Sequence, residues 1–272
     1  MARFTIDGAA INVETAGGGP ALVLLHGFAG SAAGWAAHAD VFAQRYLTVA
    51  IDLVGHGLSD APADPRRYGI AHCVEDTLGV LDRLRIRRAA VLGYSMGGRA
   101  ALALAIAAPE RVGALILEST SPGLRDPEVR LARASADALL ADAIERDGIR
   151  AFVDEWERLP LFDSQAELPE PARQALRAQR LRNSPVGLAN SLRGFGQGVM
   201  MPMHDFLSQI HAPTLIVTGA LDPRYCQAGR EMAERIPGSR LEIVAGAGHT
   251  VHLEQPERFQ QLVLDFLAGV RP

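Results

Sequence analysis

A serine between two glycines is the residue of this chain with the clearest capacity for chemistry. Ser95 lies in the middle of Gly93-Tyr94-Ser95-Met96-Gly97, which follows the apolar run 89–92 and precedes the Ala/Leu-rich run 100–107. A strand, a Gly-x-Ser-x-Gly motif and a helix in this order indicate a sharp turn that exposes the serine hydroxyl. Glycine suits both flanking positions because neighbouring backbones approach closely there. A serine hydroxyl is a weak base and a weak nucleophile, so the chemistry also requires a histidine and an acid.

Asp222 and His249 are the candidates for that acid and that base. Asp222 follows the apolar run 213–218, and His249 follows the run 240–244 and a Gly-x-Gly loop. If both runs are strands of the sheet that carries Ser95, all three residues lie at one carboxyl edge. Open α/β sheets bind their ligands at that edge. The three side chains therefore predict a Ser-His-Asp catalytic site.

Two other residues are alternatives for these roles. Glu118 lies at the end of the apolar run 112–117, and His252 lies three residues after His249. We favour His249 because the glycines before it allow its loop to turn inward. Both acids lie between the serine and the histidine along the chain, as the acid does in α/β-type serine enzymes. We favour Asp222 because it lies in a loop just beyond the end of its strand, whereas Glu118 lies at the end of its own.

The elements that must position these residues follow an alternating pattern. A hairpin signal at Asp7-Gly8 divides two alternating segments near the start, and helical periodicities such as that of residues 70–84 separate the later apolar runs. Strands that alternate with helices predict an α/β fold with a mostly parallel central sheet flanked by helices. The run 21–25 is continuously apolar, as is typical of a strand buried on both faces. The other strands expected in the sheet are 47–51, 89–92, 112–117, 213–218 and 240–244.

The alternation stops in the segment 124–205, where helical patterns occur without a convincing strand. We expect this segment to be a helical cap inserted between two strands, so that residues 1–123 and 206–272 together form the core. Eleven arginines lie in it. Its helices are expected to break at Gly148, Leu159-Pro160, Leu168-Pro169 and Ser184-Pro185.

Composition excludes several classes of function. All 27 basic residues are arginine, which excludes a Schiff-base or phosphate-loop lysine. The net charge of −4 argues against a nucleic-acid partner. No segment resembles a signal peptide or approaches the roughly 20 apolar residues of a membrane span, so a cytoplasmic protein with no membrane partner is expected. Cys73 and Cys226 are far apart in the sequence and do not have the spacing of metal ligands, so no metal site is expected. No cofactor is expected either. The sequence does not indicate the oligomeric state.

Four segments resemble the α/β-hydrolase superfamily over nearly the whole chain. They are His-Gly-Phe at 26–28, Asp-Leu-Val-Gly-His-Gly-Leu-Ser at 52–59, Gly-Tyr-Ser-Met-Gly-Gly-Arg at 93–99 and Gly-Ala-Gly-His at 246–249. The resemblance implies an oxyanion hole formed by the backbone N–H groups of Phe28 and Met96. We interpret His26 and His56 as structural residues of their loops.

Other segments resemble a narrower family, the 2-succinyl-6-hydroxy-2,4-cyclohexadiene-1-carboxylate synthases of menaquinone biosynthesis. These segments are 93–99, Ser121-Pro-Gly-Leu124, Gln179-Arg180 and the run from Asn183 to Gly198. The resemblance implies a lyase that eliminates pyruvate from 2-succinyl-5-enolpyruvyl-6-hydroxy-3-cyclohexene-1-carboxylate. In that reaction the serine, activated by the histidine, removes a ring proton and is not acylated.

The family's substrate carries several carboxylates, which planar guanidinium groups bind well. The resemblance places Arg99, Arg133 and Arg180 in the substrate pocket, together with Tyr94 and Trp156. Arg99 lies four residues after Ser95 and therefore on the same helical face, where a cation opposes the helix dipole unless an anion compensates it. The alternative for Arg99 is a salt bridge within the protein, and for Arg180 a solvated stripe with Arg173 and Arg177.

The chain departs from the synthase pattern at several positions, and none of them removes a catalytic group. They leave open a second function on the same scaffold, a carboxylesterase or a carbon–carbon bond hydrolase with Ser95 as the acyl nucleophile. Its substrate would be a carboxylic ester or a compound that is cleaved at a carbon–carbon bond. The departures are Val54 for Pro, Gln197 for Thr, Met203-His204 for Leu-Trp, Ala220 for Glu and Arg224 for Lys.

Overall fold

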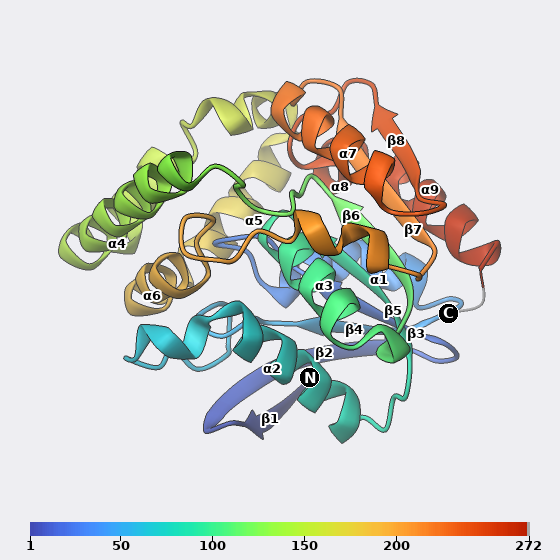
Figure 1. Cartoon of the computed structure of the whole chain (residues 1–272). Helices are drawn as coiled ribbons and strands as arrows, with labels where there is room; N and C mark the ends of the chain where they lie inside the picture. Colours follow the sequence, from blue (N-terminus) through green and yellow to red (C-terminus); the bar gives the residue numbers. More distant parts are fainter. Residues whose placement is uncertain (271–272) are drawn as a thin grey trace.

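A sheet of eight strands forms the centre of the protein, whose computed structural model describes residues 1–270 (Figure 1). The strands are β1 (Ala2–Ile6), β2 (Ala9–Gly17), β3 (Ala21–Leu25), β4 (Leu47–Ile51), β5 (Ala89–Tyr94), β6 (Val112–Glu118), β7 (Thr214–Gly219) and β8 (Arg240–Val244). Their order is β1-β2-β4-β3-β5-β6-β7-β8. Strand β2 runs antiparallel to β1 and β4, and the other neighbours are parallel. The predicted α/β-hydrolase architecture with a mostly parallel sheet is confirmed.

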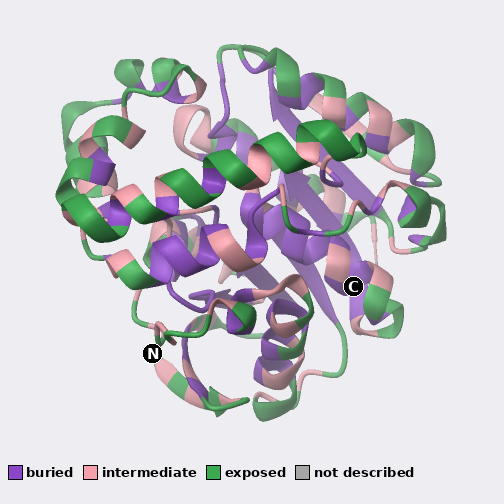
Figure 2. Cartoon of the chain, turned by 60° about the vertical axis from the view of Figure 1, so that its left-hand side comes forward, coloured by how far each residue is buried: buried purple, intermediate pink, exposed green. Residues whose placement is uncertain are grey.

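Helices cover both faces of this sheet (Figure 1). Successive residues of the central strands belong to two different cores, since Val91 packs with Leu81 on one face and Leu92 packs with Phe42 and Phe259 on the other. Figure 2 shows the strands at the centre of the sheet buried on both sides. The helices of the two layers are α2 (Ile70–Arg83), α3 (Met96–Ala107) and α7 (Pro223–Arg235) on the first face, and α1 (Ala36–Phe42) and α9 (Pro256–Ala268) on the second.

Short helices occupy several of the loops. Most are 3-10 helices of three to eight residues, and α8 is a four-residue α-helix just after His249. They are η1 (Ala32–Trp35), η2 (Pro65–Tyr68), η3 (Pro109–Arg111), η4 (Pro160–Glu167), η5 (His204–Gln209) and α8 (Val251–Glu254).

The chain between β6 and β7 contains helices and no strand in the structure. Its main helices are α4 (Pro127–Trp156), α5 (Glu170–Arg180) and α6 (Pro185–Phe195), which lie beyond the carboxyl ends of the strands (Figure 1). Gly148 interrupts α4 with a φ of 83°, and prolines begin η4 and α6 and precede α5, as predicted. We therefore retain the proposal that residues 124–205 form a cap over the core. Within the structure, no helix is long and apolar enough to cross a membrane.

The turn between β5 and α3 is as tight as the sequence predicts. A Cβ atom on Gly93 would lie 2.2 Å from the carbonyl oxygen of Gly97, and one on Gly97 would lie 2.3 Å from that of Leu25. Ser95 itself has a φ of 51°, a conformation that costs a residue with a side chain free energy. The turn lifts the Ser95 side chain out of the sheet. The backbone N–H of Ser95 donates to the carbonyl oxygen of Glu118 at 2.8 Å.

We expect Gly97→Ala to lower the free energy of unfolding by about 2–3 kcal/mol or to prevent folding, because backbone must move to admit the methyl group. Urea denaturation followed by circular dichroism measures the change. Gly18→Ala is the matched control, since nothing lies within 4 Å of a Cβ there. Equal stability of the two variants would contradict the tight packing of this turn.

Candidate active site

Ser95, His249 and Asp222 form a continuous hydrogen-bonded chain. His249 Nε2 lies 3.0 Å from Ser95 Oγ, and His249 Nδ1 lies 2.8 Å from Asp222 Oδ2. The imidazole and the carboxylate are both buried. In this arrangement the carboxylate orients the imidazole, and the imidazole can take the serine proton. The geometry is that expected of the predicted triad.

The three residues come from the carboxyl ends of three different strands. Ser95 follows β5, Asp222 follows β7 and His249 follows β8. Asp222 also caps α7, because its Oδ1 accepts from the N–H of Tyr225 at 3.2 Å. This cap explains why α7 begins at Pro223.

The two alternative residues pair with each other. Glu118 Oε1 accepts from the backbone N–H of His252 at 2.9 Å and lies 2.8 Å from His252 Nδ1. The His252 ring packs against Tyr94 and Trp35, each with a centroid distance of 4.8 Å. Glu118 and His252 therefore form a second buried pair behind Tyr94 rather than part of the chain that reaches Ser95.

Phe28 and Met96, whose backbone N–H groups are the predicted oxyanion hole, line the same pocket as Ser95. Met96 is the first residue of α3, where an amide has no acceptor within its own helix. Neither amide donates to another group in the described part of the chain. Both are therefore available to an oxygen that gains negative charge beside Ser95.

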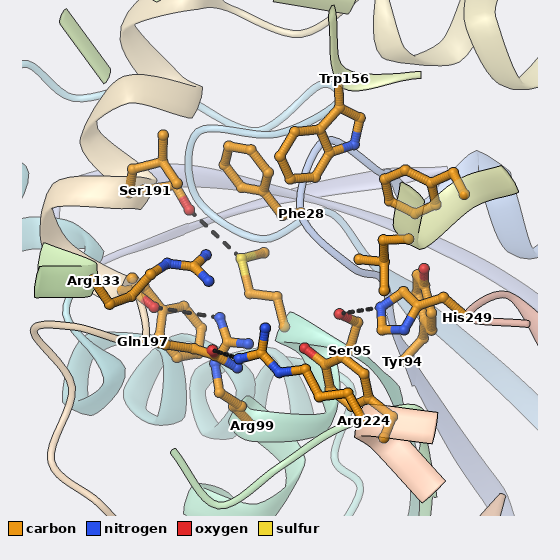
Figure 3. Close-up of a pocket in the computed structure, with 17 residues that line it drawn as sticks. Phe28, Tyr94, Ser95, Arg99, Arg133, Trp156, Ser191, Gln197, Arg224 and His249 are labelled. Carbon is orange, nitrogen blue, oxygen red and sulfur yellow. Dashed lines mark hydrogen bonds between the residues drawn. The ribbon is translucent and has the colours of Figure 1, made fainter. Parts of the chain in front are cut away.

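A pocket of about 110 Å³ opens beside Ser95. Arginine side chains gather on one side of it, and Phe28 and Trp156 lie on another, with Ser95 and His249 between them (Figure 3). Tyr94 also lines the pocket, with its ring centroid 5.4 Å from that of His249. Burial raises the pKa of the Tyr94 hydroxyl well above its usual value.

Arg99 is a buried cation in this pocket, with 7% of its surface exposed. It forms no salt bridge among residues 1–270, and its one polar contact is a 3.5 Å hydrogen bond to the carbonyl of Phe195. Its Nε atom is buried without a partner. Burial lowers the pKa of the guanidinium to about 10, so it stays protonated at neutral pH. The alternative of a salt bridge within the protein is not found in the structure.

Arg133 lines the same pocket from α4 and is partly neutralised. Its Nε donates to Asp137 Oδ1 at 2.7 Å, one turn further along the helix. The side chain is 37% exposed, in contrast to that of Asp137 at 5%. Asp137 thus fixes the stem of Arg133 and leaves its terminal NH groups to the pocket.

Arg224 is a pocket residue that the sequence reasoning did not assign. It lies two residues after Asp222 in the first turn of α7 and forms no ion pair within the structure described. Its guanidinium lies over the ring of Tyr225 and donates to Gln197 Oε1 at 3.4 Å (Figure 3). Its position two residues after Asp222 could have identified Arg224 from the sequence. If Asp222 lies near Ser95, the first turn of the helix that Asp222 caps must also lie near Ser95.

Arg180 does not line the pocket of Ser95. It is buried behind Phe162, where Nη1 donates to Glu157 at 3.1 Å and Nη2 to Gln165 at 3.2 Å. It borders a larger cavity of about 630 Å³ that shares Phe28, Tyr94, Trp156 and Phe162 with the pocket of Ser95. The alternative, a solvated stripe on α5, does not hold for Arg180 either, because Arg173 and Arg177 pair with surface carboxylates while Arg180 is buried.

His26 and His56 are loop residues with structural contacts. His26 Nε2 accepts from the N–H of Leu53 at 3.0 Å, and His56 Nδ1 lies 3.2 Å from the carbonyl of Val54. Burial lowers the pKa of His26 and lowers that of His56 to about 3, so both rings are neutral.

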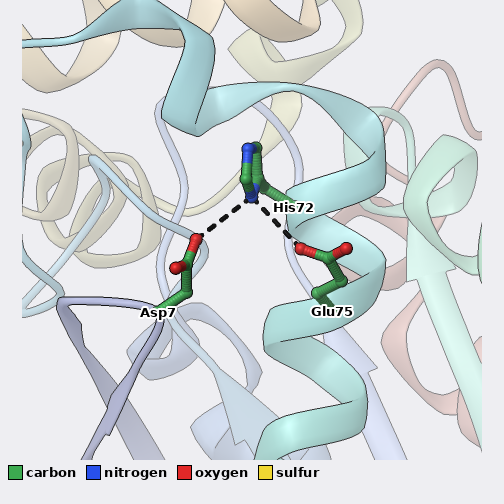
Figure 4. Close-up of side chains that lie close together, drawn as sticks. All are labelled: Asp7, His72 and Glu75. Atoms are coloured by element: carbon green, nitrogen blue, oxygen red, sulfur yellow. Dashed lines mark ion pairs between the residues drawn. The ribbon is translucent and has the colours of Figure 1, made fainter.

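One cluster on the surface has the residue types of a metal site. His72 Nδ1 lies 3.3 Å from Asp7 and 3.2 Å from Glu75 (Figure 4). Arg67 also reaches the Asp7 carboxylate at 3.5 Å, which disfavours a bound cation. We interpret the cluster as a network of surface ion pairs.

Comparisons with known proteins agree with this fold. The family model for the alpha/beta hydrolase fold matches residues 20–256, a span that contains Ser95, Asp222 and His249. The chain is 44% identical over 250 residues to the assigned 2-succinyl-6-hydroxy-2,4-cyclohexadiene-1-carboxylate synthase of Bacillus subtilis, covering 92% of this chain and 91% of that protein. The structure of MenH from S. aureus superposes with a TM-score of 0.91 at 36% identity, covering 95% of this chain and 98% of the other.

A relative with a different printed activity is also similar. The chain is 32% identical over 277 residues to a 2-hydroxy-6-oxononadienedioate/2-hydroxy-6-oxononatrienedioate hydrolase of Burkholderia vietnamiensis, covering 96% of this chain and 92% of that protein. The synthases and the hydrolase share one scaffold, so the scaffold does not distinguish their reactions. On its family match and on its fold, the chain belongs to the α/β-hydrolase fold family.

Proposed function

We propose that this protein is a lyase that eliminates pyruvate from 2-succinyl-5-enolpyruvyl-6-hydroxy-3-cyclohexene-1-carboxylate in menaquinone biosynthesis. The observation that carries the proposal is Arg99, a buried guanidinium beside Ser95 with no carboxylate partner in residues 1–270. A buried cation without a partner is costly, and a substrate carboxylate would supply the missing anion. The similarity to the synthase relatives supports the same substrate.

The substrate carries three carboxylates, on the ring, on the succinyl group and on the enolpyruvyl group. Arg99, Arg133 and Arg224 offer guanidinium groups to them from one side of the pocket (Figure 3). Phe28 and Trp156 provide an apolar wall for the ring. We propose that Arg180, which lies over the Phe162 ring in the larger neighbouring cavity, binds any part of the substrate that extends there.

The triad would act as a base in this reaction. His249 Nε2 takes the proton of Ser95, and Ser95 Oγ takes the proton from ring carbon C2, which the succinyl ketone makes acidic. The C2–H electrons form the C2=C3 double bond, the former C3=C4 electrons form C4=C5, and the C5–O bond breaks. The enolpyruvate that leaves is protonated on carbon to give pyruvate. The Phe28 and Met96 amides would stabilise the enolate oxygen of the ketone, and Asp222 the imidazolium.

Pyruvate release by the purified protein tests the proposal. The enolpyruvyl substrate is supplied with lactate dehydrogenase and NADH, and the loss of NADH absorbance is followed. A p-nitrophenyl acyl ester is assayed in parallel. Rapid pyruvate release with slow ester turnover is the expected result, and ester turnover with no pyruvate release would refute the lyase.

The second candidate is a hydrolase that uses Ser95 as an acyl nucleophile. The 3.0 Å contact between Ser95 and His249 and the two free amides suit this chemistry equally well, and the Burkholderia vietnamiensis relative supports it. That relative's dioate substrate also carries two carboxylates, so the arginines support a carboxylate-rich substrate in either function. The higher identity to the Bacillus subtilis relative, 44% against 32%, favours the lyase. A covalent adduct on Ser95, detected by mass spectrometry during turnover, would favour the hydrolase.

We expect Arg224→Gln to lower kcat/KM for the tricarboxylate about tenfold, because one charge-assisted contact is lost. Turnover of a neutral ester should be unchanged. Arg230→Gln is the matched control, since Arg230 is an exposed residue of the same helix. If both variants behave alike, Arg224 contributes only general positive charge.

A further inference from the structure

A chain of buried hydrogen bonds joins the cap segment to the loop that carries His249. Arg180 on α5 donates to Gln165 Oε1 at 3.2 Å, and Gln165 Nε2 on η4 donates to Thr250 Oγ1 at 3.0 Å. Thr250 Oγ1 donates to Glu254 Oε1 at 2.6 Å. Arg180, Gln165 and Thr250 are each less than one-tenth exposed. These three residues therefore carry the chain from one part of the fold to the other largely shielded from bulk water, and it ends at the partly buried Glu254.

The last residue of this chain holds the backbone on both sides of the candidate base. Glu254 Oε2 accepts from the N–H of Gly248 at 2.6 Å, and Oε1 accepts from the N–H of Thr250 at 3.0 Å. These two amides flank His249. The position of the imidazole relative to Ser95 therefore depends on where the Glu254 carboxylate is held.

The donors and acceptors fit in only one direction. The single proton of the Thr250 hydroxyl goes to Glu254, so the hydroxyl oxygen must accept from the amide nitrogen of Gln165. The amide oxygen of Gln165 then faces Arg180, a donor without acceptor capacity. Ser164 also lies close to the His249 loop, because a Cβ atom added to Gly248 would lie 2.2 Å from Ser164 Oγ.

We propose that Gln165 is a positioning residue, which ties the cap segment to the His249 loop through Thr250 and so sets the alignment of His249 with Ser95. This proposal rests on the proposed catalytic role of those two residues. Gln165 does not line the pocket of Ser95 and acts through Thr250 and Glu254. A loss of alignment lowers the reactivity of Ser95 without changing which substrate the pocket accepts.

Two substitutions break the chain at one bond each. Gln165→Glu keeps the acceptor for Arg180 and removes the donor to Thr250, and Thr250→Val removes the hydroxyl at nearly the same volume. Both should lower the second-order rate at which the neutral reagent diethyl p-nitrophenyl phosphate modifies Ser95, by about fivefold to tenfold. Thr250→Ser keeps the hydroxyl and should restore the rate to within about twofold.

Gln44→Glu is the matched control, because it makes the same change at an exposed position of the core. Melting temperatures are measured for all variants. Unchanged rates in Gln165→Glu and Thr250→Val would overturn the proposal, as would a loss that Thr250→Ser shares or a wild-type Ser95 that does not react. The reagent needs no carboxylate, so a reactive Ser95 with no pyruvate release would refute the proposed lyase and leave the role of Gln165 standing.

Discussion

Replacement of Ser95 by alanine is expected to lower the rate of pyruvate release by about 10³–10⁴-fold with little change in KM. The methyl group leaves His249 Nε2 without the hydroxyl that now lies 3.0 Å away. The imidazole would then have to reach the substrate proton across the space of the lost oxygen. The arginines of the pocket are untouched, so the substrate should still bind. A coupled lactate dehydrogenase assay measures kcat, and calorimetric titration measures binding.

Ser208→Ala is the matched control for this prediction, because Ser208 is exposed on η5. It should retain full activity. If Ser95→Ala kept more than about a tenth of the wild-type kcat, His249 alone would be a sufficient base and the assignment of Ser95 as proton acceptor would be wrong.

Arg99→Met is expected to reduce activity and to raise stability in the same protein. Loss of a bidentate contact to a carboxylate should lower kcat/KM by about 10²–10³-fold. The free energy of unfolding should rise by about 1–3 kcal/mol, because methionine replaces a buried guanidinium whose Nε has no partner. Enzyme assays and urea denaturation give the two quantities.

Arg45→Met provides the matched substitution at an exposed position and should change neither quantity appreciably. A lower stability of Arg99→Met would mean that Arg99 serves packing in the free protein. An equal loss of activity towards a neutral ester would mean that Arg99 does not act through a substrate carboxylate.

The different environments of the arginines explain why we assign them different roles. Arg177 has two carboxylate partners, whereas Arg99 and Arg224 have none among the residues described. Arg133 shares its charge with Asp137. A cation already paired in the free protein gains less from a substrate carboxylate than an unpaired one, because it must first give up its partner.

The residues that carry the chemistry could be predicted from the sequence because local rules place them. Continuous apolar runs mark strands buried on both faces, and the run Ala21–Leu25 is strand β3 residue for residue. The close approach of backbones at Gly93 and Gly97 leaves no alternative to glycine, so the turn that presents Ser95 is encoded in five residues. Parallel strands align their carboxyl ends, and this brings Ser95 to His249 and Asp222.

Only the tertiary structure decided which partner each polar side chain has. Glu118 and His252 bind each other, Arg180 turns to Glu157 and Gln165 behind Phe162, and Arg224 reaches the pocket beside Arg99. Helical spacing gives the face on which an arginine lies and not the carboxylate that meets it, since that carboxylate comes from a distant segment. The unpaired state of Arg99 depends on every element packed around the pocket, which no local pattern encodes.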